Sequence, residues 1–142
     1  MTNKRLGIAL TLFLAVPALA HHPFSVEYDW KKPVSLTGTV TKLEWENPHA
    51  RLYIEVEDDT GKPQSWNFEM GSLSALQKAG WRKDTVKMGD TVTIDGWLAR
   101  SPAKGYAGNM KSLWLADGRE FSGASSVGDA EPHEPIKPKS AN

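Results

Sequence analysis

Three of the four histidines in this chain stand where they could bind a metal ion: His21, His22 and His49. An amino-terminal histidine chelates Cu(II) through its α-amine and its ring Nδ1, and a second imidazole supplies a third nitrogen of the kind this ion favours. His49 follows the turn signal Asn47-Pro48, so we expect its ring at the rim of a sheet. These residues predict a copper site, with copper as the one cofactor that the sequence indicates.

The same histidines have a simpler explanation. A histidine after Asn-Pro can simply form a hydrogen bond within its own turn. Two histidines after a cleavage site can be there only because they suit the signal peptidase. Pro23 also excludes one kind of copper site. Its backbone nitrogen carries no proton, so a chelate through three successive backbone nitrogens cannot form. The metal interpretation would use His22 or Glu46 as an auxiliary ligand, whereas His133, in a Pro-rich stretch, is expected to be solvated.

Residues 1–20 have the pattern of a secretory signal peptide. Lys4 and Arg5 precede the apolar run LGIALTLFLAV, and the residues up to Ala20 form an A-x-A cleavage site. The apolar run is shorter than the ~20 residues that cross a membrane, so we expect cleavage rather than anchoring. The mature chain would begin at His21, leave the membrane, and reside in the periplasm or be secreted.

Composition excludes several classes of protein. The chain has 17 basic and 17 acidic residues, and because the leader contributes only basic ones, the mature chain is slightly acidic. A nucleic-acid binder needs a basic face, so nucleic acid is not an expected partner. The absence of cysteine from the sequence rules out thiolate metal sites and thiol catalysis. We expect a monomer that binds an unknown periplasmic protein or a small ligand.

The spacing of apolar residues shows which elements must position these side chains. It predicts strands at 34–46, 50–58 and 63–70, a helix at 72–79, and two further strands. In the first strand the pattern slips phase after Val40, as it does at a bulge. The order of three strands, one helix and two strands matches the OB-fold, a five-stranded Greek-key barrel.

The predicted architecture is therefore all-β with one short helix, in an OB-fold-like barrel over residues 34–122. A flat sandwich is the competing arrangement. An extended segment is expected at 21–33, before the barrel. The Pro-, Ser- and Ala-rich composition of residues 123–142 predicts a disordered tail.

Six tryptophans are many for one small domain. Trp66 alternates in phase with apolar neighbours, so we expect it to be buried. Trp97 is out of phase with its neighbours and should face outward or toward another element. Exposed aromatic side chains stack on sugars, bases or apolar ligands, and the ligand-binding candidates are Trp45, Tyr53 and Trp97.

Four blocks of sequence carry a resemblance: HHPFSVEYD, LTGTVTKLEWENPHARLYIEV, WNFEMGSLSALQKAGW and GDTVTIDGW. Together they resemble a family of small exported bacterial proteins that is classed as a domain of unknown function. The likeness runs over about residues 21–122. It implies an exported protein of a Gram-negative bacterium with a β-rich domain, and it implies no activity.

The residues themselves favour binding over catalysis. The sequence has no Ser-His-Asp order and no phosphate loop, and its carboxylates alternate along strands as solvated faces do. We therefore predict a non-catalytic binding or adaptor module of unknown ligand. The alternative is a periplasmic copper-binding protein that uses its new amino terminus and His49.

Overall fold

The computed structural model describes residues 24–125. The elements follow in the order α1 (Phe24–Glu27), β1 (Tyr28–Glu44), β2 (Arg51–Glu57), β3 (Pro63–Glu69), α2 (Leu73–Lys78), β4 (Thr91–Ala99), η1 (Pro102–Lys104), β5 (Ala107–Leu115) and β6 (Glu120–Ser122). The predicted leader, His21, His22 and His133 lie outside the described residues. None of the helices between residues 24 and 125 has the length and apolar character needed to cross a membrane.

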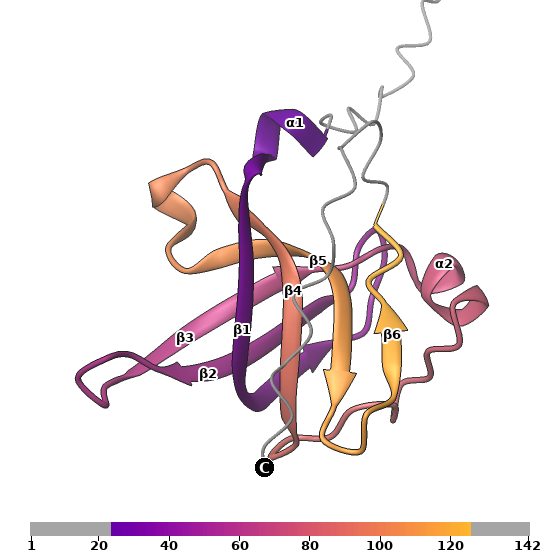
Figure 1. Ribbon diagram of the computed structural model, residues 1–142. Coiled ribbons are helices and arrows are strands. Elements are labelled where there is room, and N and C mark those ends of the chain that lie inside the picture. Colours follow the sequence, from indigo (N-terminus) through magenta and orange to yellow (C-terminus); the bar gives the residue numbers. More distant parts are fainter. Residues whose placement is uncertain (1–23, 126–142) are drawn as a thin grey trace, which may run out of the picture.

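The strands form one sheet, in the order β3-β2-β1-β4-β5-β6, with antiparallel pairing between neighbours. In addition β3 pairs with β5 in parallel, which places Glu69 opposite Asn109. Figure 1 shows β1 running beside β4, with β5 and β6 following. A mostly antiparallel sheet with one short helix was predicted from the sequence, and α1 adds a second helix of four residues.

The first strand is longer than its sequence pattern indicates. It begins at Tyr28 instead of residue 34, and its pairing with β4 is irregular between Tyr28 and Pro33. Lys31 and Lys32 are exposed there, so this part of the strand lacks the alternation of apolar residues from which a strand is predicted. The predicted phase slip is confirmed, because the register against β2 shifts between Val40 and Lys42.

A tight turn joins β2 to β3 and is organised by Asp58. Its Oδ1 accepts hydrogen bonds from the backbone nitrogens of Thr60, at 2.8 Å, and Lys62, at 3.0 Å. The Thr60 hydroxyl and these backbone groups lower the pKa of Asp58 to about 2, from an ordinary 3.8. Gly61 completes the turn with a φ of 78°, a conformation that favours glycine.

The depressed pKa of Asp58 makes the stability of this turn depend on pH. The carboxylate stabilises the folded state above its unfolded pKa of 3.8, and this contribution is lost as the pH falls through about 2. Asp58→Asn keeps the acceptor oxygen and removes the charge, so it should lower Tm at pH 7. The difference in Tm from the wild type should shrink between pH 4 and pH 2. Thermal unfolding followed by circular dichroism measures both, and a difference independent of pH would contradict this origin.

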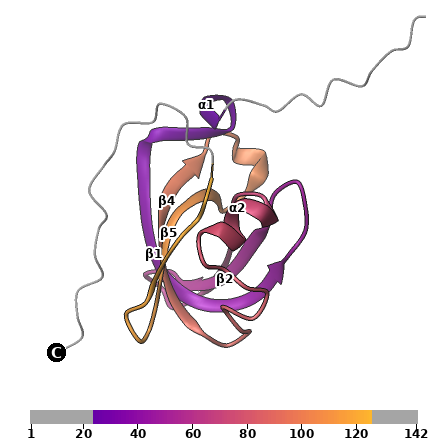
Figure 2. The same ribbon diagram turned by 90° about the vertical axis from the view of Figure 1, so that its right-hand side faces the viewer.

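The helix α2 covers one end of the core. It begins after Ser72, whose hydroxyl accepts a hydrogen bond of 3.3 Å from the Ala75 nitrogen, and it buries Leu76 completely. Figure 2 looks onto α2, with strands arranged around it. The predicted helix at 72–79 is therefore confirmed. The core beneath it includes Met70 and Trp81, both almost fully buried.

Two expectations about burial need correction. Trp66 is half-buried, not buried: its ring packs against that of Tyr106, which is itself half exposed, with the ring centroids 5.1 Å apart. The predicted tail begins too early. Gly123 is buried, its nitrogen donates to the Lys111 oxygen at 2.7 Å, and its own oxygen accepts from the Gly71 nitrogen at 2.8 Å. Main-chain hydrogen bonds, which composition does not reveal, extend the folded part beyond β6.

Candidate functional site

A line of polar side chains crosses the outer face of four strands. Glu44 of β1 lies opposite Arg51 of β2, Arg51 opposite Glu69 of β3, and Glu69 opposite Asn109 of β5. Their strand neighbours Leu52 and Phe68 are fully buried, so the alternation of a strand turns Arg51 and Glu69 to the other face. We call Glu44, Arg51, Glu69 and Asn109 the polar row.

The polar row is tied together by charge-assisted hydrogen bonds. Arg51 donates through Nη2 to Glu69 Oε2 at 2.8 Å and through Nη1 to Asn67 Oδ1 at 2.7 Å. At the β1 end, Tyr53 donates its hydroxyl to Glu44 Oε2 at 3.0 Å. Hydrogen bonds from Lys42 and Tyr53 lower the pKa of Glu44, so the carboxylate stays charged. The row therefore holds fixed, alternating charges.

His49 lies against the middle of the polar row. It ends the loop between β1 and β2, and its Nδ1 is 3.4 Å from Glu69 Oε1. The His49 side chain is 39% exposed, whereas that of Glu69 is 15% exposed. The loop is held to α2, because the Asn47 side chain accepts a hydrogen bond of 3.2 Å from the Leu73 nitrogen. The loop thus holds the partly exposed imidazole of His49 against the largely buried carboxylate of Glu69.

Exposure falls along the row toward β5 and β4. Asn109 is 3% exposed, and Trp97, opposite it on β4, is 2% exposed. Tyr28, 3% exposed, lies at the same end. Burial raises the pKa of Tyr28 well above its ordinary value, and the negative charge of Glu69 raises it further. The polar row therefore passes from a surface at His49 into a protected region beside Tyr28.

The segment α1 covers this buried end. The Phe24 ring lies 5.4 Å from the Tyr28 ring and 5.4 Å from the Trp97 ring, in the latter case edge to face. Arg100 fastens the segment by donating from its backbone nitrogen to the Glu27 oxygen at 2.8 Å. The start of the described chain is thus fixed over Tyr28 and Trp97.

Two buried oxygens at this end lack partners in the described part of the chain. The Tyr28 hydroxyl and Asn109 Oδ1 make no hydrogen bond of good geometry to any residue from 24 to 125. Leaving a buried polar group unpaired is costly, so such atoms call for a partner from elsewhere.

The structure treats the predicted ligand-binding residues differently. Tyr53 lies on the outer face within reach of the polar row. Trp45 is half-buried and packs on the core. Trp97 faces another element, Phe24, and a ligand could stack on it only if α1 moved away. Among residues 24–125, no three His, Asp or Glu side chains form a group that could hold a metal ion, and the contact of His49 with Glu69 involves a single carboxylate.

A carboxylate that the sequence analysis did not single out lies next to His49. Glu69 on β3 makes the contact, whereas Glu46, named as an auxiliary metal ligand, is exposed in the loop. Arg51 and Tyr28 were also missed as members of this region. A signal for Arg51 exists in the sequence, because a turn at residues 58–62 sets a hairpin register that pairs Arg51 with Glu69.

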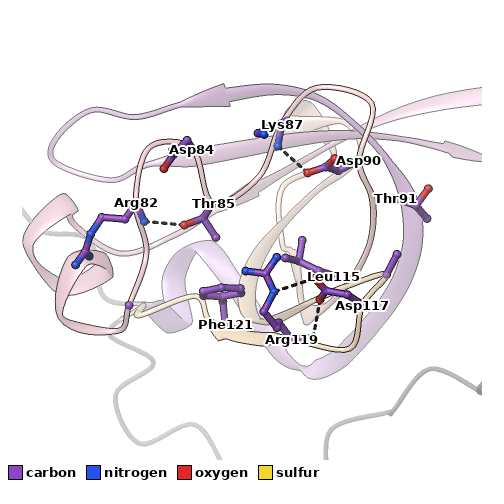
Figure 3. A pocket seen from close by; sticks show the side chains of 12 residues that line it. Arg82, Asp84, Thr85, Lys87, Asp90, Thr91, Leu115, Asp117, Arg119 and Phe121 are labelled. Atoms are coloured by element: carbon purple, nitrogen blue, oxygen red, sulfur yellow. Dashed lines mark hydrogen bonds and ion pairs between the residues drawn. The ribbon is translucent and has the colours of Figure 1, made fainter.

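A hollow with a volume of about 600 Å³ lies at the other end of the sheet, near the β5–β6 turn. Figure 3 shows contacts between residues of this hollow that are close in sequence, among them that of Arg119 Nε with Asp117 Oδ2, at 2.8 Å. Asp90 accepts a hydrogen bond of 2.8 Å from the Lys87 nitrogen. These contacts join residues that are close in sequence, so the side chains that make them stabilise turns. The hollow is therefore a weaker candidate for a ligand site than the polar row.

The comparisons with known proteins give a family but no function. A family model described as a family of unknown function (DUF6152) matches residues 10–107, which is more than half of the chain. The chain therefore belongs to this family. No curated protein matches the chain.

Proposed function

We propose that this member of the family of unknown function is an exported, non-catalytic binding module whose ligand site is the polar row together with His49. The observation that carries the proposal is the contact of His49 with Glu69, a largely buried carboxylate that Arg51 also holds. A polar network that is fixed on strands and exposes one imidazole is a preorganised binding surface.

The pairing of the strands supports an OB-like barrel as the scaffold. Pairings run from β1 to β2, β3, β5 and β4 and back to β1, and α2 follows β3 in the chain. These pairings are those expected of a five-stranded OB-fold, a fold that binds ligands on its outer face and through the loops at one end. The polar row and the loop that ends at His49 occupy that face and one of those loops.

Export is supported by the sequence alone. The basic residues, apolar run and A-x-A site of residues 1–20 are those of a leader that is removed on secretion. We propose the periplasm of a Gram-negative bacterium as the location. Removal of the leader matters for the site, since it gives His21 a free α-amine.

A non-catalytic role is supported by the way the charged groups satisfy one another. Glu69 is held by Arg51 and His49, and Glu44 by Lys42 and Tyr53. A general acid or base needs a proton that it can give or take at the working pH. The low pKa of Glu44 makes that carboxylate a poor base, and its role is better explained as fixing Tyr53.

Copper is the ligand that a specific observation favours. Phe24 packs on Tyr28 and Trp97 beside the polar row, and His21 precedes Phe24 by three residues, which span at most about 10 Å of extended chain. His21 and His22 lie outside the described residues, so their approach to His49 is part of the proposal. An amine with two imidazoles is a nitrogen set that suits Cu(II). A hydroxyl-rich ligand such as an oligosaccharide is the other candidate, because Arg, Asn and carboxylate groups bond to hydroxyls.

The export and copper proposals are tested together by native mass spectrometry. The full chain should be produced with its own leader and no affinity tag in a Gram-negative host, and then released from the periplasm. We expect a mass that corresponds to residues 21–142 and, after Cu(II) is added, one copper ion per chain. A retained leader would remove the amine ligand and contradict the copper site. A processed chain that binds no copper would leave the organic ligand as the candidate.

A further inference from the structure

The helix α1 covers the buried end of the polar row but buries little of itself. Figure 1 shows it at the end of β1. Tyr28 and Trp97 beneath it are 3% and 2% exposed, whereas none of its own four residues is fully buried. The half-buried ring of Phe24 packs on both of these rings. Because hydrophobic stabilisation grows with the apolar area removed from water, α1 is held less firmly than the strands of the core.

The chain between α1 and the rest of the sheet is irregular. The pairing of β1 with β4 is continuous from Pro33 onward, and the next pair before it is Tyr28 with Ala99. Residues 29–32 therefore stand against Leu98 alone, and three of these four residues are exposed. A bulge of this kind disrupts the ladder and lets the chain bend. Residues 29–32 thus form a stretch that can act as a hinge.

The β4–β5 loop fastens α1 through two basic side chains. Arg100 Nε donates to the Ser25 oxygen at 2.8 Å and to the Tyr28 oxygen at 3.1 Å. Lys104 Nζ lies 2.6 Å from Glu27 Oε2 and 5.3 Å from the centre of the Tyr28 ring. The Lys104 and Glu27 side chains are 37% and 29% exposed, so water and salt weaken their ion pair. We call Arg100 and Lys104 the latch.

The surface under α1 has unused hydrogen-bonding capacity. The Tyr28 hydroxyl and Asn109 Oδ1 are buried without a partner of good geometry among residues 24–125, which raises the free energy of the closed arrangement. Asn109 is paired with Trp97 across β5 and β4, so the amide and the indole lie on the same face. An aromatic ring with polar atoms nearby suits a ring-shaped ligand that carries hydroxyl groups.

We propose that α1 is a lid that swings on residues 29–32 and uncovers Trp97, Tyr28 and Asn109 as a subsite for a sugar ring or a similar hydroxyl-bearing ring. The inference rests on the proposed binding function and adds a gated part to its site. In the closed state Phe24, edge to face on Trp97, occupies the place that the ring of the ligand takes. The subsite needs no metal ion.

Hydrogen exchange of two backbone amides tests whether the lid opens by itself. The Arg100 amide donates to the Glu27 oxygen at 2.8 Å and is protected only while α1 is closed. The Met70 amide donates to the Ala50 oxygen at 2.9 Å between two buried residues and reports unfolding of the whole domain. We expect Arg100 to exchange at least about 10-fold faster than Met70, relative to their intrinsic rates, and with little dependence on urea. One rate and one urea dependence for both amides would overturn the lid.

Lys104→Gln weakens the latch, and Lys87→Gln is its matched control, because Lys87 is also exposed and lines the distant hollow. We expect Lys104→Gln to speed exchange of the Arg100 amide about 2- to 10-fold, as the loss of a partly exposed ion pair and a cation–π contact implies. The Met70 amide should be unaffected, and Lys87→Gln should change neither amide. Unchanged exchange of Arg100 in Lys104→Gln, or an equal change at Met70, would overturn the latch.

Access of a ring-sized molecule to Trp97 is measured with 4-hydroxy-TEMPO, a soluble nitroxide whose ring carries a hydroxyl group. This probe broadens the NMR signals of protons that it approaches. In Phe24→Ala we expect the indole N–H signal of Trp97 to broaden much more than that of Trp81, which is fully buried and donates to the Ser122 oxygen at 2.8 Å. Equal and weak broadening of both signals in this variant would overturn the subsite.

These measurements use the processed full chain without copper or the native ligand, so the lid and the proposed function can fail separately. A lid that opens in a protein that binds no copper would support the lid and contradict the copper function. A protein that binds copper but exchanges its Arg100 amide only on global unfolding would overturn the lid and leave the site at His49 in place.

Discussion

Replacing His49 with alanine is expected to weaken Cu(II) binding by the mature protein about 100-fold or more. The substitution removes a nitrogen donor outright, so the loss should exceed the 10- to 100-fold typical of a residue that only orients a ligand. His49 is 39% exposed, and its removal should leave the stability of the domain nearly unchanged. Calorimetric titration of the tag-free protein measures the affinity.

Two further chains make this comparison specific. His133→Ala removes an imidazole from the predicted tail and should bind copper as the wild type does. One extra residue before His21 converts its amine into an amide, and this chain should bind more weakly because an amine donor is lost. Equal affinity in the wild type, His49→Ala and the extended chain would contradict the copper site. His49 would then be only a turn residue, and the two histidines after the cleavage site would have no role in metal binding.

Replacing Trp81 with alanine is expected to lower the free energy of unfolding by about 3–5 kcal/mol. The indole is fully buried, its Nε1 donates to the Ser122 oxygen at 2.8 Å, and its ring lies 5.3 Å from that of Phe121. The substitution would leave a cavity under α2 and an unpaired oxygen on β6. Urea unfolding at equilibrium gives the difference.

Trp30→Ala is the matched control, because Trp30 is 38% exposed. The change should alter the free energy of unfolding by less than about 1 kcal/mol, as expected for a surface position. Equal losses in the two variants would mean that Trp81 is not the anchor of β6. The comparison also separates fold from site, since neither tryptophan belongs to the polar row.

Alternation of apolar residues was sufficient to predict the central strands and α2. Leu52 and Ile54 repeat every second residue and are both fully buried, and Ser72 caps the helix where the period changes. The bulge near Val40 was also visible, because a one-residue slip moves the apolar side chains to the other phase. Local rules therefore determine most of the elements in the described part of the chain.

Contacts between distant residues explain what the sequence pattern missed. Tyr28 belongs to β1 because it lies opposite Ala99 of β4, and nothing near Tyr28 in sequence reports that pairing. Trp97 is out of phase with the core, yet Phe24 buries it from the outside. Likewise the partner of His49 is Glu69, twenty positions away, because the β2–β3 hairpin folds it back toward the loop.

Paramagnetic broadening by Cu(II) locates the ligand site without assuming which residues form it. We would record ¹H–¹⁵N spectra of the ¹⁵N-labelled mature protein, tag-free, while adding Cu(II) well below one equivalent. If the site lies where His49 meets the polar row and the amino terminus, signals of His49, Glu69 and Tyr28 should broaden first, and those of Arg82 and Arg119 in the distant hollow should stay sharp. Broadening confined to the region around His133, or to that hollow, would contradict the proposed site.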